Sequence, residues 1–138
     1  MREIKYIVCH TTATDQDATI EAIQNYWRNR LGWRNPGYHF IIEADGKITQ
    51  LQPIDRPSNG VAGYNANSIH ISYIGGKDYD DRTEEQKEAM RAVVRTMKAM
   101  FPEAEILGHR DFPNVHKSCP RFDAEIEFGD ILENVTTQ

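Results

Sequence analysis

Residues 108–120 read GHRDFPNVHKSCP and hold two of the chain's five histidines and one of its two cysteines. The apolar pair Ile106-Leu107 before this segment predicts a short strand that ends at His109. Two prolines then restrict a loop that carries Cys119. A strand end and a restricted loop can hold an imidazole and a thiolate close to one another. The segment therefore predicts a functional site, which needs a further group from elsewhere in the chain.

A candidate for that group lies near the amino terminus. Residues 4–10 form a mostly apolar run that ends at His10, and such a run is typical of a strand buried inside a sheet. His10 and His109 thus both follow a buried strand, where functional sites tend to form. Two imidazoles and the Cys119 thiolate are ligands suited to zinc, and three protein ligands leave a fourth position for water. From spacing alone, zinc is a hypothesis.

The first half of the chain contains a predicted helix and a predicted hairpin. Apolar positions at helical spacing indicate a helix over about residues 17–31, capped by Asp17 or Thr19 and stopped by Gly32. Two β-prone segments within residues 38–51 flank an Asp-Gly pair, which is typical of a hairpin. Residues 52–67 are rich in turn formers and predict a loop, and residues 68–74 predict another strand.

The second half begins with the most clearly predicted helix. Thr83 and Gln86 form a capping box, an apolar stripe follows, and Pro102 ends the helix. A strand over residues 105–108 then completes a strand-helix-strand crossover, and the chain from Phe122 is expected to pack as a short helix. We therefore predict one α/β domain over residues 1–138, with a central mixed β-sheet of about five strands flanked by helices and a tail at residues 126–138.

Length and charge narrow the possible partners. The 138 residues suffice for one domain with a core, and the formal charge of −5 argues against electrostatic binding to nucleic acid or an anionic membrane. The sequence also contains no transmembrane run. From the charge and this absence together, we expect neither nucleic acid nor membrane as a partner. The first residues lead into a strand rather than a signal peptide, which predicts synthesis in the cytoplasm. We also expect a monomer with reduced thiols.

Several candidate residues also have a purely structural interpretation. Cys9 lies in an apolar strand, where a cysteine is usually inert core. His39 and His70 lie in predicted strands and fit buried histidines whose hydrogen bonds are satisfied. Lys117 fits a solvated surface charge, and Tyr38 fits an ordinary strand aromatic. Residue types alone leave both interpretations open for each of these positions.

Five groups of residues recur in the order of one known family: Val8–Thr14, Gly37–Ile42 with Asp45-Gly46, Gly63–Ile69, Gly75-Gly76, and Lys117–Pro120 with Phe122-Asp123. On these motifs the chain resembles the zinc-dependent N-acetylmuramoyl-L-alanine amidases of the phage-lysozyme type, which are related to peptidoglycan recognition proteins. The resemblance covers about residues 4–125.

The resemblance implies a function and a role for individual residues. It implies hydrolysis of the amide between N-acetylmuramic acid and L-alanine in peptidoglycan, by a phage or prophage endolysin that acts on the cell wall after release. His10, His109 and Cys119 match the family's zinc ligands, and Tyr38 and Lys117 match its catalytic tyrosine and lysine. We also expect Tyr64 and Asn67 to contact substrate.

The chain departs from the family pattern at two places, and two other functions are also compatible with its sequence. The loop from His109 to Cys119 is two residues longer than in the family's member from T-odd coliphages, and Gly60 stands where that member has a histidine thought to face substrate. One alternative is a module that binds peptidoglycan without cutting it. The other is a cysteine hydrolase that uses Cys119 with His109 or His116.

Overall fold

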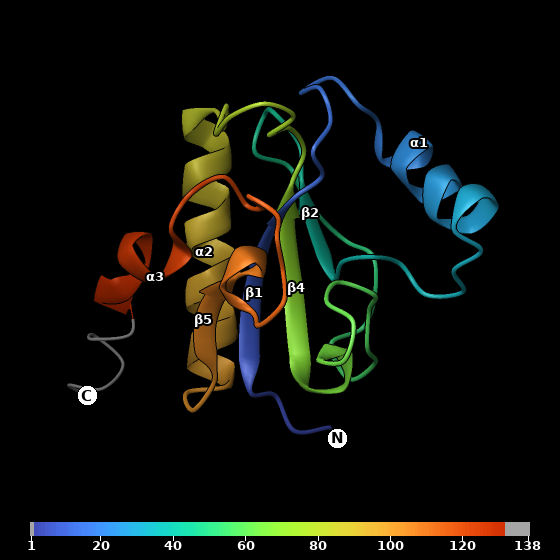
Figure 1. Cartoon of the computed structure of the whole chain (residues 1–138). Helices are drawn as coiled ribbons and strands as arrows, with labels where there is room; N and C mark the ends of the chain where they lie inside the picture. The colour runs from blue at the N-terminus through green and yellow to red at the C-terminus, as the bar shows by residue number, and fades with distance from the viewer. Residues whose placement is uncertain (1, 132–138) are drawn as a thin grey trace.

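The computed structural model describes residues 2–131, which form a five-stranded sheet in the order β3-β2-β4-β1-β5. Three helices accompany the sheet (Figure 1). The strands are β1 (Tyr6–Thr11), β2 (Phe40–Ile42), β3 (Ile48–Gln50), β4 (Ser68–Tyr73) and β5 (Glu105–Gly108), and the helices are α1 (Ile20–Asn25), α2 (Glu84–Met100) and α3 (Ala124–Glu127). The predicted α/β fold with a mixed five-stranded sheet is confirmed.

Strand β1 lies inside the sheet, as its apolar sequence predicts. It pairs in parallel with β4 on one side and with β5 on the other. Strand β2 is parallel to β4, while the edge strand β3 is antiparallel to β2 across the turn at Asp45-Gly46, so the predicted hairpin is confirmed. The observed β1 begins two residues later than the predicted run and ends one residue beyond His10, so His10 is part of the strand.

The two faces of the sheet have different surroundings, because side chains alternate along a strand. Ile7 and Cys9 of β1 belong to the main core with the apolar side of α2, which lies behind the sheet in Figure 1. Val8 belongs to a smaller cluster with Val61 and Phe112, and His10 shares the same alternation. Cys9 is therefore a buried core cysteine, whereas His10 faces the side of the sheet away from α2.

Helix α2 forms as its sequence predicts. The Thr83 side chain accepts from the backbone N–H of Gln86, and the Gln86 side chain accepts from the Thr83 N–H, so both halves of the capping box are present. Gln86 is fully buried, and its amide also donates to the carbonyl oxygens of Ile42 and Ile74. The cap therefore also ties the start of α2 to the ends of β2 and β4.

The predicted helix over residues 17–31 is shorter and less regular than expected. Thr19 caps α1, because its side chain accepts from Ala22, so the alternative cap at Asp17 is wrong. After Asn25 the chain continues as a π-helical turn, Tyr26–Arg30, and Gly32 ends it with a φ of +69°. The wider turn places Trp27 in a second core cluster against Ile41 and Ile74.

The chain after Cys119 packs before the described residues end. Asp123 caps α3, which fits the expected short helix, and Phe128 and Ile131 are buried in the main core. Residues 132–138 of the predicted tail lie outside the described residues. Between residues 2 and 131, no helix has the length and apolar character needed to cross a bilayer.

Candidate functional site

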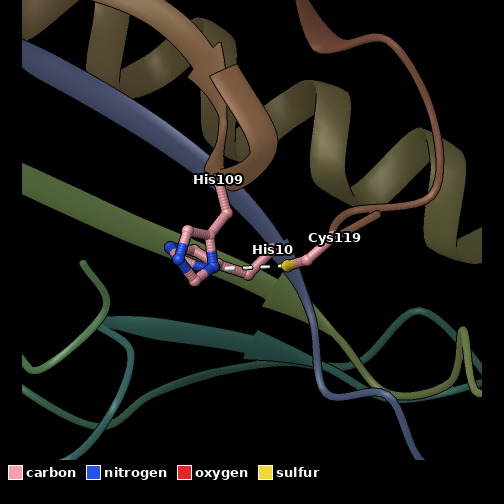
Figure 2. A group of neighbouring side chains, drawn as sticks. All are labelled: His10, His109 and Cys119. Carbon is pink, nitrogen blue, oxygen red and sulfur yellow. Dashed lines mark hydrogen bonds between the residues drawn. The ribbon is translucent and has the colours of Figure 1, made fainter. Parts of the chain in front are cut away.

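The three predicted ligands converge at the carboxyl end of β1. One potential ligand atom each of His10, His109 and Cys119 lies within 4.8 Å of the other two, and Figure 2 shows the three side chains pointing toward one another. His10 comes from β1, His109 from the 3₁₀ turn η3 (His109–Asp111) directly after β5, and Cys119 from the loop that follows. The structure therefore brings His10 next to Cys119, which lies 109 positions later in the sequence, and next to His109.

Hydrogen bonds hold the Cys119 loop against β1, β4 and η3. The N–H of Arg110 donates to the Cys119 carbonyl at 2.8 Å, and the Tyr73 hydroxyl donates to the Pro120 carbonyl at 2.8 Å. The Thr11 N–H donates to the Cys119 sulfur at 3.2 Å. Contacts on both sides of Cys119 thus restrict its sulfur to a position 3.8 Å from His10 Nδ1.

The donor set has the chemistry that a zinc site requires. Burial and the neighbouring imidazoles lower the pKa of His10 well below its ordinary value, and burial followed by the Lys117 charge lowers that of His109. Both rings are therefore neutral at pH 7, the state in which an imidazole ligates metal. Burial raises the pKa of Cys119 to about 11, and the Thr11 hydrogen bond opposes this shift. A bound cation would reverse it, because metal coordination deprotonates a thiol.

A groove leads to these residues. It has a volume of about 730 Å³ and is lined in part by Trp33, Gly60, Tyr64, His109 and Lys117. A smaller adjoining hollow of about 210 Å³ is lined by His10, Cys119, Tyr38 and Lys117 among others. The predicted metal ligands, Tyr38 and Lys117 therefore face one continuous region, although the Lys117 side chain itself is exposed.

The two predicted substrate contacts have different positions. Tyr64 lines the groove, and its ring packs against Phe112 with a centroid distance of 4.7 Å. Asn67 is absent from the residues that line the groove within the described chain, and its amide donates to the Glu3 carbonyl at 2.8 Å. A substrate contact through Tyr64 is thus compatible with the groove, while the Asn67 side chain is hydrogen-bonded to the amino-terminal segment.

Sequence reasoning did not assign a role in the site to Trp33, Asn65 or His70. Trp33 lines both the groove and the hollow. His70 is fully buried in β4, with its Nδ1 2.8 Å from Nε2 of His10. The interpretation of His70 as a buried histidine with satisfied hydrogen bonds is correct, but it did not include the contact with His10. The signal that could have shown more is the alternation in β4, where His70 and Ser72 interrupt a run of isoleucines.

His39 adds a buried imidazole just before β2, and it predicts a pH-dependent stability. Burial lowers the pKa of His39 to about 4, against an ordinary value of 6.5, and the nearby Arg2 guanidinium contributes. The unfolded chain therefore binds the proton more readily, so stability is complete above about pH 6.5 and falls as the pH drops toward 4. At pH 5 the loss from His39 alone is about 2 kcal/mol.

Replacing His39 by glutamine should reduce the difference in unfolding free energy between pH 7 and pH 5 by about that amount. Urea titrations at the two pH values measure this difference for the parent and the variant. His116→Gln, at an exposed imidazole, is the matched control and should retain the parental pH dependence. An undiminished pH dependence in His39→Gln would contradict the assigned shift.

Comparison with known proteins gives the site a context. The family model described as N-acetylmuramoyl-L-alanine amidase matches residues 1–122. The endolysin of Enterobacteria phage K11 is 30% identical over 125 residues, which cover 87% of this chain and 81% of the relative. The amidase LysC from Clostridium intestinale URNW superimposes with a TM-score of 0.78 at 26% identity, covering 98% of this chain and 87% of that one.

The endolysin of Thermus scotoductus MAT2119 bacteriophage Ph2119 superimposes with a TM-score of 0.79 at 22% identity, covering 98% of this chain and 86% of that one. This likeness shows a shared fold. The family model extends from the amino-terminal segment past Cys119, so it includes every residue that converges at the end of β1. The chain therefore belongs to the N-acetylmuramoyl-L-alanine amidase family.

Proposed function

We propose that this amidase holds a zinc ion with His10, His109 and Cys119 and uses it to hydrolyse the bond between N-acetylmuramic acid and L-alanine in peptidoglycan. The observation that supports the proposal is the convergence of two neutral imidazoles and one thiol within 4.8 Å beside a groove. Three protein ligands are the arrangement of catalytic zinc sites, whereas structural sites commonly use four. The zinc would polarise the scissile carbonyl and lower the pKa of a water molecule to about 7.

Lys117 would stabilise the negative charge that develops on the carbonyl oxygen. Its side chain lines both the groove and the hollow, and its charge lowers the pKa of His10 and His109, so the ammonium acts on this region. A positioned donor of this kind contributes on the order of 3 kcal/mol to a reaction that passes through an oxyanion. Lys117 is not required as a ligand in this arrangement.

Tyr38 would act as a hydrogen-bond donor rather than as a base. Its ring lies 5.1 Å from that of His10, and its hydroxyl donates to the Thr11 carbonyl at 3.3 Å. Burial raises the pKa of the Tyr38 phenol above its ordinary value of 10, so the group stays protonated at neutral pH. The single phenol proton would have to turn from the Thr11 carbonyl to reach the scissile carbonyl, while the oxygen can orient the attacking water without taking its proton.

The cysteine-hydrolase alternative is less compatible with the site. A cysteine nucleophile reacts as the thiolate and needs surroundings that lower its pKa. Burial instead raises the pKa of Cys119 to about 11. The exposed His116 lies in the loop, and the sulfur lies 3.8 Å from Nδ1 of His10, whose other ring nitrogen is hydrogen-bonded to His70.

The module that only binds peptidoglycan is also less favoured. Such a module needs the groove but has no use for a ligand set or a protonated phenol beside it. The name of the K11 relative supports the further proposal that this chain serves phage lysis, with synthesis in the cytoplasm and action on the cell wall after release.

Digestion of purified peptidoglycan sacculi tests the reaction. We expect new amino groups on L-alanine, detected by end-group labelling, without new reducing sugar ends. Cys119→Ala, purified in parallel, is the control for contaminating hydrolases and should release neither. Reducing ends without amino-terminal alanine would instead indicate a glycosidase, which normally needs a pair of carboxylates.

A further inference from the structure

A chain of hydrogen bonds links His10, at the end of β1, through His70 to Asn65, in the turn before β4. It begins at two backbone N–H groups. The side-chain oxygen of Asn65 accepts from the N–H of Gly60 at 3.1 Å and from that of Val61 at 2.8 Å. Backbone N–H groups only donate, so they identify this atom as the amide oxygen and fix the orientation of the amide. Asn65 therefore presents an acceptor, and not a donor, to its third neighbour.

That third neighbour is Nε2 of His70, which lies 2.9 Å from the Asn65 oxygen. Because the oxygen can only accept, His70 Nε2 carries the proton, and in a neutral ring Nδ1 is then an acceptor. His70 Nδ1 lies 2.8 Å from Nε2 of His10, so His10 must carry its proton on Nε2. The remaining nitrogen, His10 Nδ1, is left with a free lone pair and lies 3.8 Å from the Cys119 sulfur.

The space for the His70 ring depends on Gly60. A Cβ at position 60 would collide with Nδ1, Cγ and Cε1 of that ring. The backbone at Gly60 does not have a positive φ, so its conformation suits other residues, and the nearest obstacle to a side chain there is the His70 ring. The departure noted in the sequence at Gly60 thus has a structural counterpart, since an imidazole from β4 fills the space above this glycine.

We propose that Asn65 and His70 are positioning residues that fix His10 in its Nε2–H tautomer and so present Nδ1 as the ligand atom. The proposal rests on the proposed zinc function, and it extends that function to two residues that are not themselves ligands of the metal. A hydrogen bond to the second nitrogen of a ligating histidine fixes its tautomer and orientation, and its loss typically costs about tenfold to a hundredfold in metal affinity.

Five variants test the proposal through zinc affinity, measured by competition with a chelator of known affinity. His70→Phe keeps a ring but removes the acceptor, and Asn65→Leu removes the first acceptor of the chain. Both should weaken zinc binding about tenfold to a hundredfold. Asn65→Asp keeps the oxygen that Gly60, Val61 and His70 use, and it should remain within about threefold of the parent.

Gly60→Ala leaves every hydrogen-bonding group in place and displaces only the His70 ring, so it should weaken zinc binding as well. Asn67→Ala, in the same turn as Asn65 but with its amide on the Glu3 carbonyl, is the matched control for zinc affinity and should not change it. Circular dichroism and thermal unfolding identify any variant that fails to fold, and affinities are compared only among folded proteins.

Nitrogen-15 spectra of the imidazoles provide a second readout that needs no metal. The metal-free parent should show His10 protonated on Nε2, and His70→Phe should show a mixture of tautomers. Protonation on Nδ1 in the parent, or parental zinc affinity in folded His70→Phe, would overturn the proposal while leaving the zinc function standing. A parent with the expected tautomer that binds no zinc would instead refute the zinc function.

Discussion

Alanine at His10, His109 or Cys119 is expected to remove the bound metal and to lower kcat by roughly a thousandfold or more. The reason is that each residue supplies one of three converging ligand atoms, so removal of any one leaves an incomplete site. Metal content per chain, determined by elemental analysis after gel filtration, gives the first readout, and the rate of sacculus clearing gives the second. Added zinc should restore activity to chelated parent protein and not to the variants.

The chain provides a matched control for each residue type. Cys9→Ala changes the other cysteine, which is buried among core residues on the α2 side of the sheet, and it should retain one equivalent of metal. His116→Ala changes an exposed histidine of the same loop and should do the same. A metal-free preparation with full activity would show that the reaction does not use the proposed zinc.

Lys117→Ala should lower kcat by roughly a hundredfold while metal content, fold and KM stay close to those of the parent. The ammonium would be removed from the oxygen on which charge develops, while the three ligands would remain in place. Steady-state kinetics on a soluble muramyl peptide separates kcat from KM, and metal analysis of the same preparation shows whether the site is intact.

Two further variants define what Lys117 contributes. Lys117→Arg should recover only part of the rate, because a planar guanidinium does not take the position of a compact ammonium. Lys77→Ala removes another exposed lysine, which pairs with Asp15 at 3.8 Å, and is the control for a general change in charge. Near-parental turnover of Lys117→Ala would make Lys117 an ordinary surface residue, as its exposure alone allows.

Much of the architecture follows from local sequence patterns. The capping box at Thr83, the Asp45-Gly46 turn and the apolar run of β1 each act within a few residues, and each produced the predicted element. The irregular helix after Thr19 was less predictable, because the π-helical turn places Trp27 against core residues far away in the sequence. Local preferences thus describe elements well, and tertiary packing adjusts their ends.

The three candidate ligands were also accessible from the sequence, since each follows a buried strand or lies in a restricted loop and matches a family motif. The environment of these residues could not be predicted from the sequence. Whether the Cys119 thiol is charged and whether Tyr38 can act as a base depend on burial. Burial depends on the assembled chain, so the residue type alone left both roles open.

His70 shows most clearly what the sequence determined and what tertiary structure decided. The sequence by itself determined that His10 and His70 lie in buried strands whose side chains alternate between two faces. Only the parallel pairing of β1 with β4 decided that both imidazoles share the face away from α2, where they form a hydrogen bond across 60 residues of chain. A shift of one residue in that register would turn His70 toward α2, because strand side chains alternate with a period of two. The alternation in β4 indicates which of its side chains share a face, but the partner strand and its register are decided by the packing of the whole sheet.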